Sequence, residues 1–149
     1  MNREFMKIAI KEAKKAYSAG EVPVGAVIVK DGEIVAKGRN TREKDNSALG
    51  HAEINAIKKA CKKLNSWRLD DCELYVTMEP CIMCSGAIVH SRIKKLIIGT
   101  KHIKNAYTEK QHEFKIDYYK YNNIETKFGI LQEECSNILH EFFKNLRKR

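Results

Sequence analysis

The stretch that decides the fold is CELYVTMEPCIMCSGAIVHSRIKKLIIGT, from Cys72 to Thr100. CELYVT and KKLIIGT are rich in strand-forming residues, and the residues from Ile82 to Ser91 have helical character. Pro80 suits the first turn of the helix between the two strands. A strand, a helix and a strand in this order normally form a right-handed crossover between parallel strands. The sequence therefore predicts a sheet that contains parallel strands and carries a helix on its face.

The residues before this stretch predict an antiparallel pair in the same sheet. VGAVIVK and EIVAKG resemble strands, and Asp31-Gly32 between them is a strong signal for a tight hairpin turn. Apolar residues recur at helical spacing before Gly20, which is a stop signal, and a further helix follows His51. Residues 40–50, NTREKDNSALG, are polar without a period and predict a loop.

The residues after Thr100 complete the predicted fold. Residues 101–123 show only a weak period and predict a helix in part, residues 124–128 predict a last strand, and apolar residues from Leu131 to Leu146 predict a terminal amphipathic helix. We expect a single domain over residues 1–149. Its fold class is α/β, a three-layer α/β/α sandwich with a mixed central sheet of about five strands.

Composition and charge limit the classes of function. At 149 residues and 43% apolar composition, the chain can build one core. No apolar run is long enough to span a bilayer, and the first residues lack the pattern of a secretory signal. We therefore expect a cytoplasmic protein that does not bind a membrane. The chain has five cysteines, an odd number, and the cytosol keeps thiols reduced, so we expect no disulfide framework. The net charge of +9 would attract a polyanion, but it is spread along the chain.

Cys81 and Cys84 form a C-x-x-C pair at the predicted start of a helix, where unpaired N–H groups favour thiolates. Alone, the pair could be a redox couple, half of a zinc site, or two thiols in a core. His51 and Glu53 also lie at an apparent helix start. A histidine and two cysteinates give zinc three ligands and leave a fourth position for water, which is the pattern of a catalytic site. Glu53 would then be free for proton transfer.

The combination of H-x-E and P-C-x-x-C resembles the signature of zinc-dependent nucleobase deaminases. The resemblance implies a cytidine deaminase-like fold and one zinc ion per chain, held by His51, Cys81 and Cys84. It also implies that Glu53 is the catalytic residue, which protonates the ring nitrogen and passes a proton to the departing ammonia. The implied activity is hydrolytic deamination.

Longer stretches are similar to the bacterial tRNA adenosine deaminase branch of that family, namely GEVPVGAVIVKDG, residues 66–99 and the tail FFKNLR. This resemblance implies a homodimer that makes inosine at the wobble position, with the target base flipped out of the tRNA anticodon loop. It implies that Asn40 hydrogen-bonds the substrate, and that Phe143, Lys144 and Arg147 contact nucleic acid. We expect the neighbouring Phe142 to be a core residue.

Two segments depart from the pattern of that branch. Residues 47–50, Ser-Ala-Leu-Gly, replace its usual Asp-Pro-x-Ala before the histidine. After the fourth strand His102 takes the place of an aspartate, Lys104 keeps a lysine, and residues 105–107 replace small residues of a loop beside the anticodon. Asn122 or Asn123 could still supply a base contact.

Three functions therefore remain open from the sequence. The first is the deamination of adenosine in tRNA. The second is the deamination of a free base or nucleoside such as guanine, cytosine or adenosine, in which the altered segment after Thr100 closes the pocket against a polymer. The third is a zinc-stabilised, non-catalytic nucleic-acid-binding subunit, against which Glu53 speaks, because a structural zinc site needs no free carboxylate.

Overall fold

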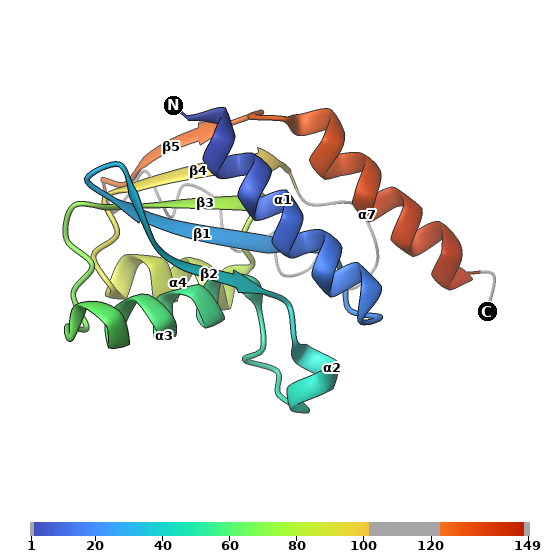
Figure 1. Ribbon diagram of the computed structural model, residues 1–149, viewed down its shortest axis with the longest axis horizontal. Coiled ribbons are helices and arrows are strands. Elements are labelled where there is room, and N and C mark those ends of the chain that lie inside the picture. The colour runs from blue at the N-terminus through green and yellow to red at the C-terminus, as the bar shows by residue number, and fades with distance from the viewer. Residues whose placement is uncertain (1, 102–122, 148–149) are drawn as a thin grey trace.

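The protein is built on a mixed five-stranded sheet with strand order β2-β1-β3-β4-β5 (Figure 1). The structure, a computed structural model, describes residues 2–101 and 123–147. The strands are β1 (Gly25–Lys30), β2 (Glu33–Arg39), β3 (Cys72–Met78), β4 (Lys95–Thr100) and β5 (Glu125–Phe128). The helices are α1 (Arg3–Ser18), α2 (Arg42–Asp45), α3 (Ala52–Leu64), α4 (Ile82–His90) and α7 (Gln132–Arg147).

Strand pairing follows the two predictions made from the sequence. β1 pairs antiparallel with β2 and with β3, whereas β3, β4 and β5 run parallel to one another. The β1–β2 turn places Asp31 at φ 52° and Gly32 at φ 77°, the two positive angles of a tight hairpin turn. The β3-α4-β4 unit is a crossover between parallel strands, and the predicted last strand is present as β5. The expected α/β fold with a mixed sheet is confirmed.

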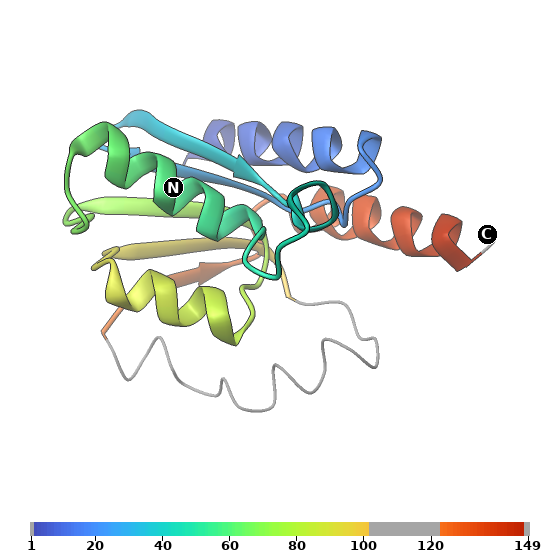
Figure 2. The ribbon, with the colours of Figure 1, turned by 90° about the horizontal axis from the view of Figure 1, so that it is seen from below.

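The helices lie on both faces of the sheet. α1 and α7 cover one face, and α3 and α4 cover the other (Figures 1 and 2). Alternate residues of each central strand divide between two cores, as the period of a strand requires. On β1, Ile28 belongs to the core that includes α3 and α4, whereas Val27 and Val29 face the core that includes α1. The three layers predicted from the sequence are therefore present.

Two local predictions were wrong. Residues 40–50 were expected to form only a loop, but Arg42–Asp45 form the short helix α2. Pro80 was expected in the first turn of α4, but the helix begins at Ile82 with Cys81 as its N-cap, so Pro80 precedes the helix. The predicted helical part of residues 101–123 lies outside the described residues, apart from Lys101 and Asn123. Within the described ranges, no helix has the length and apolar character needed to cross a membrane.

Candidate metal and catalytic site

The first half of the site lies at the start of α3. His51 is the N-cap of this helix, with extended backbone angles, and Glu53 is its second residue. The carboxyl of Glu53 is buried, with 4% of the residue exposed. The prediction that His51 and Glu53 flank a helix N-terminus is confirmed. At that position both side chains can reach the same space, which they could not do from the middle of a helix.

The second half lies at the start of α4. Cys81 is the N-cap, and Cys84 is the third residue of the helix and is fully buried. The hydroxyl of Ser85 donates to the carbonyl oxygen of Cys81 at 2.7 Å, which fixes the cap residue against the first turn. Both cysteines are free of disulfides.

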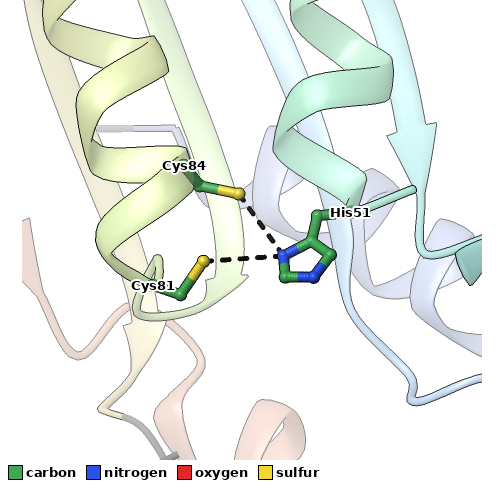
Figure 3. A group of neighbouring side chains, drawn as sticks. All are labelled: His51, Cys81 and Cys84. Carbon is green, nitrogen blue, oxygen red and sulfur yellow. Dashed lines mark hydrogen bonds between the residues drawn. The ribbon is translucent and has the colours of Figure 1, made fainter. Parts of the chain in front are cut away.

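The two helix starts bring three donor atoms together (Figure 3). Nδ1 of His51 lies 3.6 Å from Sγ of Cys81 and 3.5 Å from Sγ of Cys84. The possible ligand atoms of these three residues all lie within 4.8 Å of one another. One imidazole nitrogen and two sulfurs form a donor set that suits zinc. The three residues are thus positioned to bind a metal.

The pKa values of the two cysteine thiols are shifted in opposite directions. The hydrogen bond from the Cys84 thiol lowers the pKa of Cys81 to about 4, and a hydrogen bond with His51 acts in the same direction. The same bond to Cys81, together with burial, raises the pKa of Cys84. The bond with Cys81 also raises the pKa of His51. The lowered pKa favours the thiolate form of Cys81, which is the form that ligates a cation.

Glu53 is the buried acid next to these donors. Burial raises its pKa from the usual value near 4.5 to about 7, and the negative charge of Cys81 adds to the shift. A carboxyl group with a pKa near the working pH can both give and take a proton. The site thus combines three metal donors with one group suited to general acid and base chemistry.

Comparison with known proteins agrees with this chemistry. The sequence profile of MafB19-like deaminases matches residues 1–147. The chain belongs to the MafB19-like deaminase family. It is 45% identical over 97% of its length to the tRNA-specific adenosine deaminase of Bacillus subtilis (strain 168), 90% of which is covered. The predicted membership of the deaminase superfamily is confirmed.

Two solved structures extend the comparison. One, from studies of A-to-I editing by tRNA:A34 deaminases at the wobble position of transfer RNA, is 35% identical to this MafB19-like deaminase, with a TM-score of 0.81 over 93% of this chain and 100% of the other. The other, guanine deaminase from Bacillus subtilis, is 43% identical, with a TM-score of 0.65 over 81% of this chain and 75% of the other. Relatives of this deaminase therefore include proteins named for different substrates.

Asn40, the expected substrate contact, is 8% exposed and is engaged with the backbone on both sides. Its Nδ2 donates to the carbonyl of Val22 at 3.2 Å, and its Oδ1 accepts from the N–H of Arg42 at 3.0 Å. In this deaminase Asn40 thus joins the α1–β1 loop to the segment that leads to His51. The local contact with Arg42 is that of a turn asparagine, which the sequence also allows, whereas the contact with Val22 was not predicted.

The tail of this MafB19-like deaminase divides between core and surface. Phe142 is buried and packs edge-on against Tyr17, as expected for a core residue. Phe143, expected to contact nucleic acid, is half-buried against the core that includes α3 and α4. Lys144 is exposed. Arg147 ends α7, and its side chain lies outside the described residues, as do His102, Lys104, residues 105–107 and Asn122.

Two residues that support the site were also missed from the sequence. Asn55, on α3, donates through Nδ2 to the carbonyl of Arg39 at 2.8 Å and to the hydroxyl of Thr41 at 2.9 Å. Glu21 accepts two backbone N–H groups of α2. Both contacts join residues far apart in the sequence, so no local pattern announces them. The only local signal for this role of Asn55 is that it is a polar residue four positions after His51.

Proposed function

We propose that this chain is a zinc-dependent hydrolytic deaminase that converts adenosine to inosine at the wobble position of tRNA. The observation that carries the proposal is the buried carboxyl of Glu53 beside the three donors of His51, Cys81 and Cys84. A site built only to hold a structural metal would have no use for a buried acid with a raised pKa. The relative named for tRNA adenosine deamination matches nearly the whole chain.

The donor set supports zinc, one ion per chain, as the cofactor. His51, Cys81 and Cys84 supply one nitrogen and two sulfurs, and three protein donors leave a position open for a reactant. Bound there, zinc supplies Lewis-acid activation of the attacking water. The lowered pKa of Cys81 favours the ionised thiol that ligation requires.

Glu53 is proposed as the catalytic residue that moves protons. In the reaction, adenosine and water give inosine and ammonia, so a C–O bond forms at the ring carbon and the C–N bond to the amine breaks. The carboxylate of Glu53 takes a proton from the attacking water and delivers it to the ring nitrogen. It then takes the second proton, from the newly attached hydroxyl, and delivers it to the amine, which leaves as ammonia. Burial excludes bulk water from Glu53 and raises its pKa to about 7, so that both directions of transfer are accessible.

The remaining assignments concern substrate and assembly. Asn40 is proposed as a substrate-binding residue, and Phe143, Lys144 and Arg147 as contacts to the anticodon stem and loop. The net charge of +9 favours a polyanionic partner. We also propose that the single domain of residues 1–149 acts in the cytoplasm as a homodimer, as its resemblance to tRNA adenosine deaminases implies.

A free base is the second candidate substrate. The observation that favours it is the 43% identity to guanine deaminase from Bacillus subtilis. A non-catalytic zinc-stabilised subunit is the weakest alternative, because such a subunit has no need of Glu53. The two catalytic candidates differ in whether the target base is presented by a polymer.

A paired assay tests the proposal. The zinc-loaded protein is given an anticodon stem-loop with adenosine at the wobble position, and separately a panel of guanine, cytosine, adenine and their nucleosides. We expect inosine in the stem-loop and little ammonia from the panel, with a stem-loop carrying guanosine at that position as the control. Ammonia release from a free base, with the stem-loop left unchanged, would replace the tRNA proposal with the second candidate.

A further inference from the structure

Glu21, in the loop between α1 and β1, is a carboxylate that is buried without a basic partner among the described residues. It is 3% exposed, and no described lysine or arginine lies within ion-pair distance of it. A buried charge is costly unless hydrogen bonds stabilise it. Glu21 must therefore be held by its contacts with other polar groups.

Those contacts are two backbone N–H groups of α2. Oε1 of Glu21 accepts from the N–H of Glu43 at 2.9 Å, and Oε2 accepts from the N–H of Lys44 at 2.8 Å. These N–H groups belong to the first turn of a helix and have no partner within the helix. Thr41, the N-cap of α2, makes no side-chain cap hydrogen bond, so Glu21 takes the place of a cap from a distant part of the chain.

The segment that Glu21 holds leads directly to the site. The N–H of Thr41 donates to the carbonyl of Gly50 at 2.8 Å, which closes residues 41–50 into a loop. A β-carbon at Gly50 would lie 2.9 Å from the Cα and the nitrogen of Arg42, so the two ends of the loop are in close contact. His51 follows Gly50 immediately. Displacement of α2 would therefore move the loop of residues 41–50, which ends next to His51.

The same loop is joined to the α1–β1 connection by Asn40. Asn40 contacts the carbonyl of Val22 and the N–H of Arg42 through its side chain, and its own N–H donates to the carbonyl of Val24 at 3.2 Å. Glu21, in the α1–β1 loop, thus binds α2, and Asn40, just before α2, binds the α1–β1 loop, so both side chains join the same two segments. Loss of the Glu21 contacts would leave Asn40 to hold the junction alone.

We infer that Glu21 is a positioning residue for substrate binding: its carboxylate fixes α2, and through α2 it fixes the loop of residues 41–50 and Asn40. This inference rests on the proposed function for its kinetic consequence. Its structural part is independent of any activity, because it concerns two backbone N–H groups. The metal donors on α3 and α4 do not contact Glu21, and the carbonyl of His51 is held in α3 by the N–H of Asn55 at 3.0 Å, so we expect zinc binding to be kept without Glu21.

The structural part is tested by hydrogen exchange in the full-length, zinc-loaded protein. In the wild type, the amides of Glu43 and Lys44 should exchange at least about tenfold more slowly than unbonded loop amides. In Glu21→Ala both should lose this protection, whereas Glu21→Asp should keep part of it. The matched control is Glu12→Gln, which removes an equally buried carboxylate that pairs with Lys15 and Arg39 rather than with α2. Fast exchange of both amides in the wild type, or unchanged protection in Glu21→Ala, overturns the inference.

The kinetic part uses the anticodon stem-loop as substrate. In Glu21→Gln we expect KM to rise by about tenfold and kcat to change by less than about threefold, with zinc content unchanged, because the loss falls on binding before the chemical step. Glu21→Asp should recover part of the KM. An equal rise of KM in Glu12→Gln would show a general loss of stability and would overturn the positioning role. If the wild type itself does not deaminate the stem-loop, the proposed function fails, while the exchange experiment still tests Glu21.

Discussion

A β-carbon added to Gly38 would lie 2.6 Å from the backbone nitrogen of Ala56. β2 and α3 therefore approach each other backbone to backbone, with no room for a side chain between them. α3 carries His51 and Glu53 at its start, so this contact sets how far these two residues of the candidate site lie from the sheet. The geometry of the site therefore requires glycine at position 38.

Replacement of Gly38 by alanine should push α3 away from the sheet. We expect Gly38→Ala to lower the free energy of unfolding by at least about 1–3 kcal/mol, because backbone atoms cannot yield as a flexible side chain can. Gly86→Ala on α4 is the matched control. Among residues 2–101 and 123–147, nothing lies within 4 Å of a β-carbon there, so alanine should raise stability by about 0.5–1 kcal/mol through its helix propensity. Urea denaturation measures both, and a neutral Gly38→Ala would contradict the close contact.

Removal of the Glu53 carboxylate should abolish turnover without loss of metal. Glu53→Gln keeps the shape of the side chain but cannot transfer protons, and we expect kcat to fall by at least about 10²–10⁴-fold. Zinc content per chain, measured by atomic absorption, should stay the same because Glu53 is not one of the grouped donors. Full turnover in this variant would remove Glu53 from the mechanism.

Glu53 should also make the metal-free protein less stable as the pH rises. Its pKa is about 7 in the folded protein and near 4.5 without the burial that raises it. The folded state thus keeps a proton that the unfolded chain has released, and stability falls between these two values. Metal-free Glu53→Gln should lack this fall and should be more stable than the wild type at pH values above 7. Thermal unfolding across this range measures it, and parallel curves for the two proteins would speak against the raised pKa.

The metal-free protein should be alkylated selectively at Cys81. Because the pKa of Cys81 is lowered to about 4, its alkylation rate should be nearly constant between about pH 6 and about pH 8. Cys61, whose pKa is raised by burial, should instead react faster with each step in pH, and buried Cys135, with a pKa of about 12, should react only on unfolding. Mass spectrometry of tryptic peptides gives the rates. Zinc should protect Cys81; reaction at Cys81 that follows the profile of Cys61 would refute the prediction.

The tail should contribute to RNA affinity through charge. Lys144 is exposed on α7, so Lys144→Ala should weaken stem-loop binding and reduce the slope of log K against log salt by about 1. Lys63→Ala, which removes an equally exposed lysine from α3 on the other face of the sheet, should leave that slope unchanged. Fluorescence anisotropy at several salt concentrations measures it. An equal effect of the two variants would point to net charge rather than to a contact of the tail.

Local patterns in the sequence predicted most of the fold and the four residues that the structure brings together in the candidate site. The hairpin at Asp31-Gly32 and the crossover from β3 to β4 are short-range features, so turn chemistry and periodicity were enough. His51 and Glu53 could be placed because a polar segment and an amphipathic helix meet there. The order of the strands in the sheet was not predicted, since it depends on pairing between distant segments.

What local patterns missed were the contacts between distant polar groups. Helix α2 has a weak local signal because its cap is the carboxylate of Glu21, from a different part of the chain. The engagement of Asn40 with Val22 was invisible for the same reason. A polar residue in a loop gives no sign of which distant backbone group it will meet.

The three residues that could hold a metal come from two helices in different parts of the chain, His51 from the start of α3 and the cysteines from the start of α4. An ion held by all three is also a cross-link, and its binding free energy is added to the stability of the fold. Without the ion, the chain would open more often and would be more exposed to proteases. Cellular zinc supply would then govern the abundance of this protein as well as the fraction that is active.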